Sequence, residues 1–511
     1  MRHMIACLVA IGCLLTADVA RAASCNSLSS IKLPNTTITM ATEVAAGPFT
    51  PPGARGGGRG AAAQELPAFC RVAATLKPSS DSDIKIEVWL PVANWNGKFQ
   101  AVGNGGWNGT IQYAAMSGAL RQGYATSSTD TGHEGTTASF ALGHPEKVVD
   151  FGYRAVHEMT VAAKAIVNAF YGSAPRYAYW NGCSAGGRQA LKEAQMFPAD
   201  YDGIIAGSPV ADHIGRAAQA SRVAQALEKN PGGRLTPQKA QAVHDAALAA
   251  CDAQDGTKDG VIADPKACTF DPGTLQCKGA DEPSCLTAAQ VESVRMIYSS
   301  ATNAKNRRVI GGLARGSELG WTDMGWSAAA RSSGLDHFKY VVHQDEGFDL
   351  AAFNFDTDIV KADEADKGTI NALDTNMKAF FARGGKLLQY HGWTDPQVSP
   401  FNSVDYYTRV VGAMGGARAV EASYRLFMVP GMNHCQGGAG TDTFDKMAVI
   451  EQWVEQKKAP DSIVASHATD GKVDRTRPLC PYPQVAAYTG TGSTDDASNF
   501  VCKAPQAGST R

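Results

Sequence analysis

A five-residue turn, Gly182-Cys183-Ser184-Ala185-Gly186, is the sequence feature that most constrains how this chain can fold. Residues 176–180 before the turn predict a short strand, and residues 187–197 after it predict a helix that Pro198 ends. Only small residues fit on either side of the central serine when a strand turns this sharply into a helix. The serine hydroxyl is then exposed at a helix N-terminus. A serine in this position can act as a nucleophile. The alternative interpretation is a tight strand-to-helix turn without a catalytic role.

The segments around this turn alternate between strand and helix patterns. Strands are predicted at residues 84–90, 98–102, 203–207, 386–390 and 424–429, and helices at residues 153–172, 375–383 and 444–458. This alternation is typical of a mostly parallel sheet covered by helices. It stops between about residues 209 and 373, which indicates one α/β domain interrupted by a long insertion.

The first 22 residues have the pattern of a secretory signal peptide. Arg2 precedes an apolar run at residues 5–15, and a small-residue cleavage motif follows at residues 20–22. The run is too short to span a bilayer, which takes roughly 20 residues. An N-terminal core helix and a lipoprotein signal are the alternatives. We therefore expect a secreted or periplasmic protein.

The charge balance argues against nucleic-acid and membrane partners. The chain has 47 Lys and Arg against 49 Asp and Glu, a net charge of -2. Proteins that bind nucleic acid show a basic excess, and polybasic membrane patches need runs of Lys and Arg, of which this chain has none with five or more residues. No protein partner is indicated either.

A nucleophilic serine needs a base and a group that orients the base. After a turn of this kind, the acid and then the histidine should follow in the chain. Asp395 comes just after a predicted strand, and His434 follows the next one, so the order is correct. An Asp-Pro turn and an ordinary loop histidine are the alternative interpretations. His391 is a rival base, but it precedes the acid.

Ten cysteines remain once the predicted signal is removed, and an even number in an exported chain suggests disulfides. The sequence alone cannot fix their connectivity. Cys183 directly precedes the predicted nucleophile and Cys435 directly follows the predicted base, so a bond between them would tie the two segments together. Separate buried thiols are the alternative.

Two further loops have the composition of binding sites. Gly103 to Gly109 form a glycine-rich loop after a strand, where the second amide of an oxyanion hole is expected; an ordinary turn is the alternative. Residues 251–268 gather four aspartates, and hard oxygen ligands at this density suit Ca²⁺. A solvated cluster of Asp-Gly turns fits that spacing equally well.

Taken together, these segments resemble the tannase and feruloyl esterase family of secreted α/β-hydrolases, which includes mono(2-hydroxyethyl) terephthalate hydrolases. The resemblance covers nearly the whole mature chain. It depends on residues 182–189 (GCSAGGRQ), on Asp395 within HGWTDP and on residues 431–435 (GMNHC). It implies an α/β-hydrolase fold with a large inserted lid domain, with catalytic segments at 23–210 and 374–511 and the lid at 211–373.

The resemblance also implies roles for individual residues. Ser184, Asp395 and His434 would form the catalytic triad, and Ala185 and Gly106 would supply the oxyanion amides. A structural Ca²⁺ far from the chemistry would be held by Asp252, Asp255 and Asp259 and by the carbonyls of Thr257 and Val261. The implied disulfides are Cys183–Cys435, Cys25–Cys70, Cys251–Cys268, Cys277–Cys285 and Cys480–Cys502.

The expected activity is serine-dependent hydrolysis of an aromatic, phenolic acid ester through an acyl-enzyme. A feruloyl ester is the favoured substrate. A gallate ester or mono(2-hydroxyethyl) terephthalate is the alternative within the family. A non-catalytic binding protein on the same fold is the alternative from another class.

Overall fold

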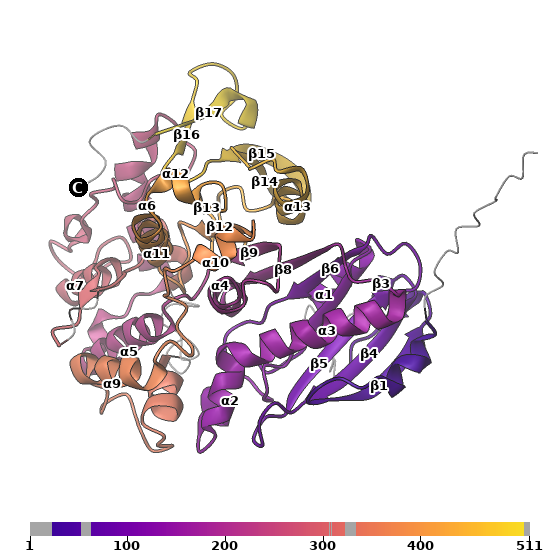
Figure 1. Cartoon of the computed structure of the whole chain (residues 1–511). Coiled ribbons are helices and arrows are strands. Elements are labelled where there is room, and N and C mark those ends of the chain that lie inside the picture. Colours follow the sequence, from indigo (N-terminus) through magenta and orange to yellow (C-terminus); the bar gives the residue numbers. More distant parts are fainter. Residues whose placement is uncertain (1–22, 53–62, 306, 308, 322–333, 505–511) are drawn as a thin grey trace, which may run out of the picture.

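The computed structural model describes residues 23–52, 63–305, 307, 309–321 and 334–504. The predicted signal peptide therefore lies outside the described residues. A nine-stranded sheet forms the centre of the molecule (Figure 1). Its strands lie in the order β1 (Thr36–Val44), β4 (Phe69–Leu76), β5 (Ile84–Pro91), β7 (Ala125–Thr129), β6 (Lys98–Val102), β8 (Tyr177–Cys183), β9 (Gly203–Gly207), β12 (Lys386–Gly392) and β13 (Tyr424–Val429). Neighbours from β7 to β13 are parallel, whereas β1, β4 and β5 pair antiparallel. The predicted parallel sheet is confirmed as the larger part of a mixed sheet.

Helices and small hairpins complete the fold. The longer helices are α1 (Tyr113–Arg121), α3 (Ala155–Tyr171), α4 (Ala185–Met196), α5 (His213–Lys229), α6 (Pro237–Cys251), α7 (Ala288–Tyr298), α9 (Phe355–Asp366), α11 (Pro400–Ala413) and α13 (Lys446–Gln456), and the shorter ones include α2 (Pro145–Val149), α10 (Lys378–Ala382) and α12 (Ala417–Val420). The strand pairs outside the main sheet are β2 (Gly47–Phe49) with β3 (Gln64–Leu66), β10 (Ala301–Thr302) with β11 (Val309–Ile310), β14 (Ile463–Thr469) with β15 (Lys472–Leu479), and β16 (Val485–Tyr488) with β17 (Phe500–Lys503). None of the described helices is long and apolar enough to cross a membrane.

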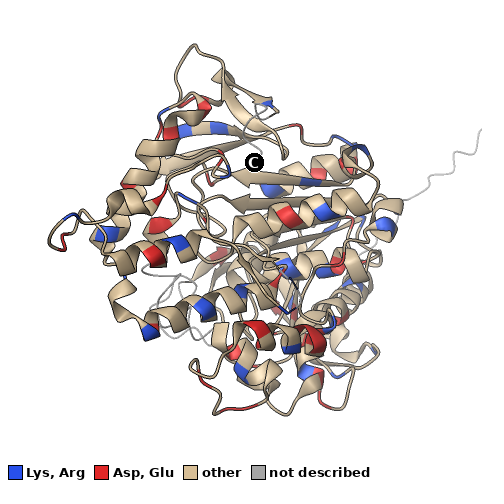
Figure 2. Cartoon of the chain, turned by 90° about the vertical axis from the view of Figure 1, so that its left-hand side faces the viewer, with Lys and Arg blue, Asp and Glu red and all other residues tan. Residues whose placement is uncertain are grey.

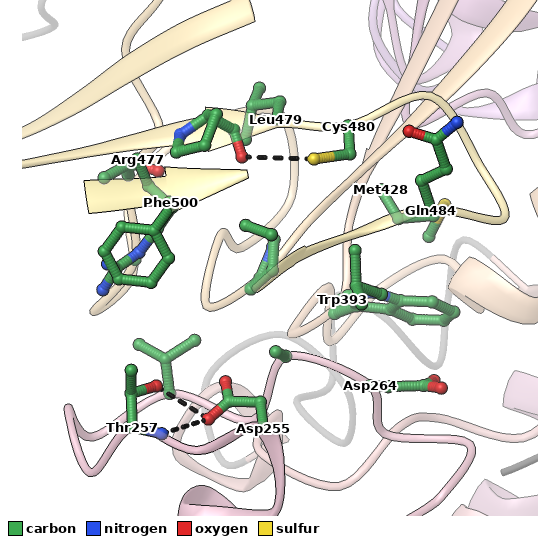
Figure 3. A pocket seen from close by; sticks show the side chains of 18 of the residues that line it. Asp255, Thr257, Asp264, Trp393, Met428, Arg477, Leu479, Cys480, Gln484 and Phe500 are labelled. Carbon is green, nitrogen blue, oxygen red and sulfur yellow. Dashed lines mark hydrogen bonds between the residues drawn. The ribbon is translucent and has the colours of Figure 1, made fainter. Parts of the chain in front are cut away.

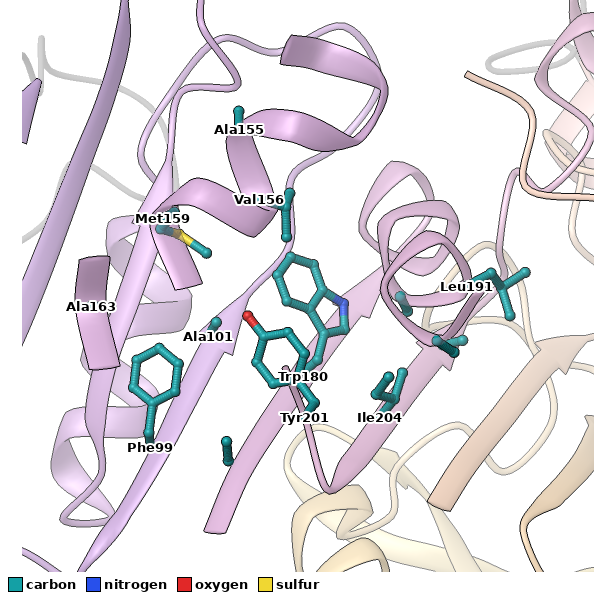
Figure 4. Packing of buried hydrophobic residues seen from close by; sticks show 14 of the residues in the cluster. Phe99, Ala101, Ala155, Val156, Met159, Ala163, Trp180, Leu191, Tyr201 and Ile204 are labelled. Atoms are coloured by element: carbon teal, nitrogen blue, oxygen red, sulfur yellow. The ribbon is translucent and has the colours of Figure 1, made fainter. Parts of the chain in front are cut away.

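Helices pack on both faces of the main sheet, because successive residues of a strand point to opposite sides. Ile204 of β9 and Trp180 of β8 lie in one apolar cluster with residues of α3, α4 and α11. Ile205, the next residue of β9, lies in a second cluster with Trp453 of α13. Figure 4 shows the first cluster, in which Leu191 of α4 lies on the same side as Ile204. The result is a three-layer α/β/α arrangement, as expected for an α/β-hydrolase fold.

A long segment leaves the sheet after β9 and returns at β12. These two strands are hydrogen-bonded neighbours, with Gly203 opposite Lys386. The segment between them holds α5, α6, α7 and α9, which lie to the left in Figure 1, away from β1, β4 and β5. It also has two apolar clusters of its own. The residues predicted as a lid, 211–373, fall within this segment.

The last described strands form two pairs, β14–β15 and β16–β17, neither of which the sequence analysis predicted. A disulfide between Cys480 and Cys502 links the two hairpins. On the side of the molecule seen in Figure 2, basic and acidic residues are interspersed along the helices. This mixture fits the near-neutral charge balance of the sequence.

Candidate active site

Ser184 occupies a strained backbone position at the junction of β8 and α4. Its φ of 64° and ψ of -121° lie in a region that residues with a side chain rarely adopt, at a cost on the order of 1–3 kcal/mol. β8 ends at Cys183 and α4 begins at Ala185, so Ser184 alone makes the turn. A Cβ atom on Gly182 would lie 2.5 Å from the carbonyl oxygen of Gly186. The predicted need for small residues in this turn therefore has a steric basis.

The glycine-rich loop after β6 packs directly on the start of α4. A Cβ atom on Gly103 would lie 2.5 Å from the Cα atom of Gly186, so only glycine fits there. The N–H of Gly186 donates to the carbonyl oxygen of Asn104 at 2.8 Å. Gly106, in the same loop, has a φ of 52° that favours glycine. The structure thus brings the loop that carries Gly106 to the helix end that carries the amide of Ala185.

Asn104 holds this loop in place, a role that the sequence analysis missed. Its side-chain amide donates to the carbonyl oxygens of Thr129 at 2.8 Å and Thr110 at 3.1 Å. It also exchanges two hydrogen bonds with the side chain of Gln189 on α4, at 3.1 and 3.2 Å. Asn104 and Gln189 are both buried. The sequence does contain an indication of this role, which is an asparagine within a run of glycines. Its amide can donate and accept hydrogen bonds, whereas the glycines have no side chain.

Asp395 lies fully buried in the turn after β12. Its Oδ1 accepts from the backbone N–H groups of Gln397 at 2.8 Å and Val398 at 2.9 Å. Its Oδ2 lies 2.6 Å from Nδ1 of His434 and 3.0 Å from Nε2 of His391. Burial alone would raise the pKa of Asp395, but the two histidines and their hydrogen bonds outweigh burial and hold that pKa below its usual range. The carboxyl group is therefore ionised at neutral pH.

His391, the rival base in the sequence analysis, is fully buried and has both ring nitrogens engaged. Its Nδ1 lies 2.7 Å from the hydroxyl of Ser403. Its Nε2 lies near both Asp395 and the carbonyl oxygen of Val398, at 3.0 and 3.2 Å. A histidine held in this way can position Asp395 but has no nitrogen left for a substrate or for Ser184.

A disulfide joins the turn that carries Ser184 to the loop that carries His434. Cys183 and Cys435 are bonded, and their Cα atoms lie 6.0 Å apart. Because consecutive Cα atoms are about 3.8 Å apart, those of Ser184 and His434 lie within about 14 Å of each other. With Nδ1 of His434 directed at Asp395, Nε2 is the nitrogen that remains for proton transfer. A serine, a histidine and an ionised carboxylate in this order can carry out acyl transfer.

The other implied disulfides are also present in the structure. Their Cα–Cα distances, 5.0 to 5.6 Å, are ordinary for this bond, and the pairs are Cys25–Cys70, Cys251–Cys268, Cys277–Cys285 and Cys480–Cys502.

The acidic loop after α6 directs its carboxylates at its own backbone and at Arg477. Asp252 accepts from the backbone N–H of Asp259 at 3.2 Å, and Asp255 accepts from the N–H and hydroxyl of Thr257 at 2.8 and 2.7 Å. Oδ2 of Asp259 pairs with Arg477, whereas its Oδ1 is buried without a hydrogen-bond partner. Burial and the two neighbouring carboxylates raise the pKa of Asp255, against the hydrogen bonds from Thr257. An orphaned carboxylate oxygen among neighbouring acids fits a bound cation.

Part of this acidic loop packs against the segment that leads to His434. Asp255 and Trp393 line the same cavity, which Figure 3 shows. Val261 packs against Gly431, where an added Cβ atom would lie 3.0 Å from the Cγ2 atom of the valine. Gly431 is three residues before His434. The acidic loop therefore supports the segment that positions the histidine.

Comparisons with known proteins identify the family. The family described as "Tannase and feruloyl esterase" matches residues 70–503. An uncharacterized esterase of Xanthomonas campestris is 40% identical, over 98% of this chain and 95% of that protein. The mono(2-hydroxyethyl) terephthalate hydrolase of Piscinibacter sakaiensis is 33% identical, over 87% of this chain and 86% of that protein. The crystal structure of feruloyl esterase B from Aspergillus oryzae is similar with a TM-score of 0.88 and 31% identity, over 94% of this chain and 99% of that one. This chain therefore belongs to the tannase and feruloyl esterase family and is a carboxylic ester hydrolase.

Proposed function

We propose that this hydrolase uses Ser184 as its nucleophile, His434 as its general base and Asp395 to orient that base. One observation carries the proposal. The strained turn that presents Ser184 is bonded, through Cys183–Cys435, to the loop in which His434 contacts a buried and ionised Asp395. A non-catalytic binding protein on the same fold would need neither the backbone strain at Ser184 nor a buried carboxylate in contact with His434.

The reaction follows from these positions. His434 takes the proton of the Ser184 hydroxyl while the serine oxygen attacks the ester carbonyl carbon, and Asp395 stabilises the charged imidazole. The negative charge on the carbonyl oxygen is stabilised by the amides of Ala185 and Gly106, the first of them at the positive end of α4. His434 then protonates the leaving alcohol. Water, activated by the same histidine, hydrolyses the acyl-enzyme and releases the acid.

The proposed substrates are esters of phenolic acids, with ferulate esters first. The similar crystal structure is that of a protein named feruloyl esterase B, which supports this choice. Gallate esters and mono(2-hydroxyethyl) terephthalate are the alternatives, since the family description includes tannase and one relative is named for the terephthalate ester. We also propose that the protein is exported, because five disulfides form and persist in oxidising compartments.

A rate comparison tests the substrate. We expect kcat/KM for methyl ferulate to exceed that for methyl gallate and for mono(2-hydroxyethyl) terephthalate by about tenfold or more. The gallate ring has three hydroxyls, and each would need a hydrogen-bond partner from the protein once it is buried. The terephthalate monoester has a free carboxylate, which would need a positively charged side chain. Initial rates at several concentrations of each ester give the comparison. Faster cleavage of either alternative would reassign the substrate, and no cleavage of any of the three would contradict the proposed function.

We also propose that the acidic loop binds one structural Ca²⁺. The carboxylates of Asp252, Asp255 and Asp259 and the carbonyls of Thr257 and Val261 would hold it. The ion would neutralise three neighbouring carboxylates, and the orphaned Oδ1 of Asp259 is the support for it. It takes no part in making or breaking the ester bond.

Removal of Ca²⁺ is expected to lower the thermal stability of the protein. At Ca²⁺ a hundredfold above its Kd, chelation with EGTA should lower Tm by about 3 °C for a chain of this length. Scanning calorimetry with and without EGTA measures the difference. The Asp255→Asn variant should lose this response. Asp264→Asn, which changes an acid of the same loop outside the ligand set, should keep it. An unchanged Tm in EGTA would contradict the calcium proposal.

A further inference from the structure

Three potential metal ligands meet on the far side of α4 from the candidate active site. They are His157 of α3, Glu193 of α4 and Asp200 of the loop before β9. One ligand atom from each residue lies within 4.8 Å of the other two. Glu193 is nine residues after Ser184, about 14 Å further along the helix axis. The cluster is therefore separate from the ester-hydrolysing groups.

Glu193 is the member of the cluster that requires an explanation. It is fully buried, and neither of its carboxylate oxygens accepts a hydrogen bond from an N–H or hydroxyl group of the described residues. The adjacent Asp200 side chain is also a carboxylate, so it offers Glu193 no donor unless the pair shares a proton. A buried carboxylate without a donor is costly unless a proton or a cation neutralises it.

The other two ligands are held in place by their surroundings. Nδ1 of His157 lies 2.6 Å from Oδ2 of Asp200. The imidazole of His157 stacks on the ring of Phe197, with centroids 3.8 Å apart and planes 10° from parallel. The amine of Lys164 donates to the backbone carbonyl oxygen of Asp200, which fixes the loop on α3. The side chains are therefore already gathered, and an ion would take the place of the bond between His157 and Asp200.

We propose that His157, Glu193 and Asp200 bind one divalent transition-metal ion, with Zn²⁺ as the best fit. One imidazole and two carboxylates are ligands that Zn²⁺ accepts at about 2.0–2.2 Å, with a water molecule as the fourth ligand. An imidazole ligand disfavours Ca²⁺ and Mg²⁺, which prefer all-oxygen sites. The side chain of His157 is 28% exposed and provides the route of entry. The negative end of α4, close to Glu193, also favours a cation.

The ion would have a structural role. It links α3, α4 and the loop that leads into β9, and so braces the helix whose opposite end presents Ser184. This proposal does not depend on the esterase proposal, since its ligands touch none of the catalytic groups.

Metal titration of the full chain tests the site. The protein is first stripped of transition metals and then kept in excess CaCl₂, so that the acidic loop does not compete. Calorimetric titration with ZnCl₂ should show one specific site. Zn²⁺ at a hundredfold above its Kd should raise Tm by about 3 °C. CoCl₂ should give the visible absorption bands of a four-coordinate nitrogen and oxygen site.

Three variants decide the assignment. Glu193→Gln and His157→Ala should each lose the Zn²⁺ site and the cobalt bands. His467→Ala is the matched control: Nδ1 of His467 lies 2.6 Å from Asp474, as in the cluster, but this exposed pair belongs to none of the three-ligand groups among the described residues. That variant should bind Zn²⁺ like the parent.

Several results would overturn the proposal. The first is a parent protein whose Tm and calorimetric signal do not respond to Zn²⁺. The second is a parent whose stability does not respond to metal, together with a Glu193→Gln variant that is more stable than this parent. That result would mean that Glu193 and Asp200 share a proton in the parent and bind no ion. The third is equal Zn²⁺ binding by the parent and His157→Ala. Hydrolysis of methyl ferulate is measured on the same samples and tests the esterase proposal. Zn²⁺ binding tests the metal site, so failure of one proposal can be told apart from failure of the other.

Discussion

Replacing Ser184 with alanine is expected to lower kcat for ester hydrolysis by about 10⁵–10⁶-fold. The reason is that the serine oxygen forms the covalent bond to the acyl group, and no other side chain can take its place in the strained turn. Residual hydrolysis should come only from substrate binding and the oxyanion amides. Steady-state rates with methyl ferulate, or with p-nitrophenyl acetate as a general ester, measure the loss.

The turn itself allows sharp controls for this variant. Alanine keeps the Cβ atom, so Ser184→Ala retains the strain at φ 64° and should unfold at nearly the same temperature as the parent. Ser184→Gly should be equally inactive but more stable by about 1 kcal/mol, because glycine tolerates this backbone region. Ser117→Ala removes a buried serine of α1 that bonds only to its own helix, and should keep full activity. A Ser184→Ala enzyme that retains even a tenth of the parent rate would exclude Ser184 as nucleophile.

The sheet could be predicted where strands carry strong apolar patterns. β6, β9 and β13 begin and end at the predicted residues, because each is a short run buried on both faces. β1 was missed, since its threonine-rich sequence is partly exposed at the sheet edge. The β14–β15 hairpin was missed because Val464 and Val473 are exposed, so no alternation of apolar residues marks its strands.

In the candidate site, too, residues that are fixed by local sequence could be predicted, whereas contacts between distant residues could not. Ser184 could be placed because its turn is a local steric problem with few solutions. The hydrogen bonds of Asn104 to Gln189 span 85 residues of sequence, and no local pattern reports a contact of that kind. The same holds for His391: its place in the sequence suggested a rival base, and only the fold shows both of its nitrogens engaged inside the protein.

The two histidines near Asp395 should differ in their effect on catalysis by several orders of magnitude. His434→Ala is expected to lower kcat by about 10⁵–10⁶-fold, because the proton of the serine then has no acceptor. His391→Gln is expected to lower kcat by only about tenfold. The amide of glutamine can still donate to Asp395, and that carboxylate keeps its bonds from Gln397, Val398 and His434. Rates of acyl-enzyme formation for both variants, with Tm as the check on folding, give the comparison.

Rescue by added imidazole makes the assignment independent of the size of the loss. The side chain of His434 is 12% exposed, so His434→Ala leaves a space that a small base can enter from solvent. Imidazole should therefore restore part of the activity of His434→Ala, with a rate that rises as the neutral base forms. It should not affect His391→Gln, since His391 is fully enclosed. Two results would instead make His391 the base. One is rescue of His391→Gln by imidazole, and the other is a folded His391→Gln protein whose kcat falls as far as that of His434→Ala. His391 would then have to break its bond to Ser403 or to Asp395 during each turnover.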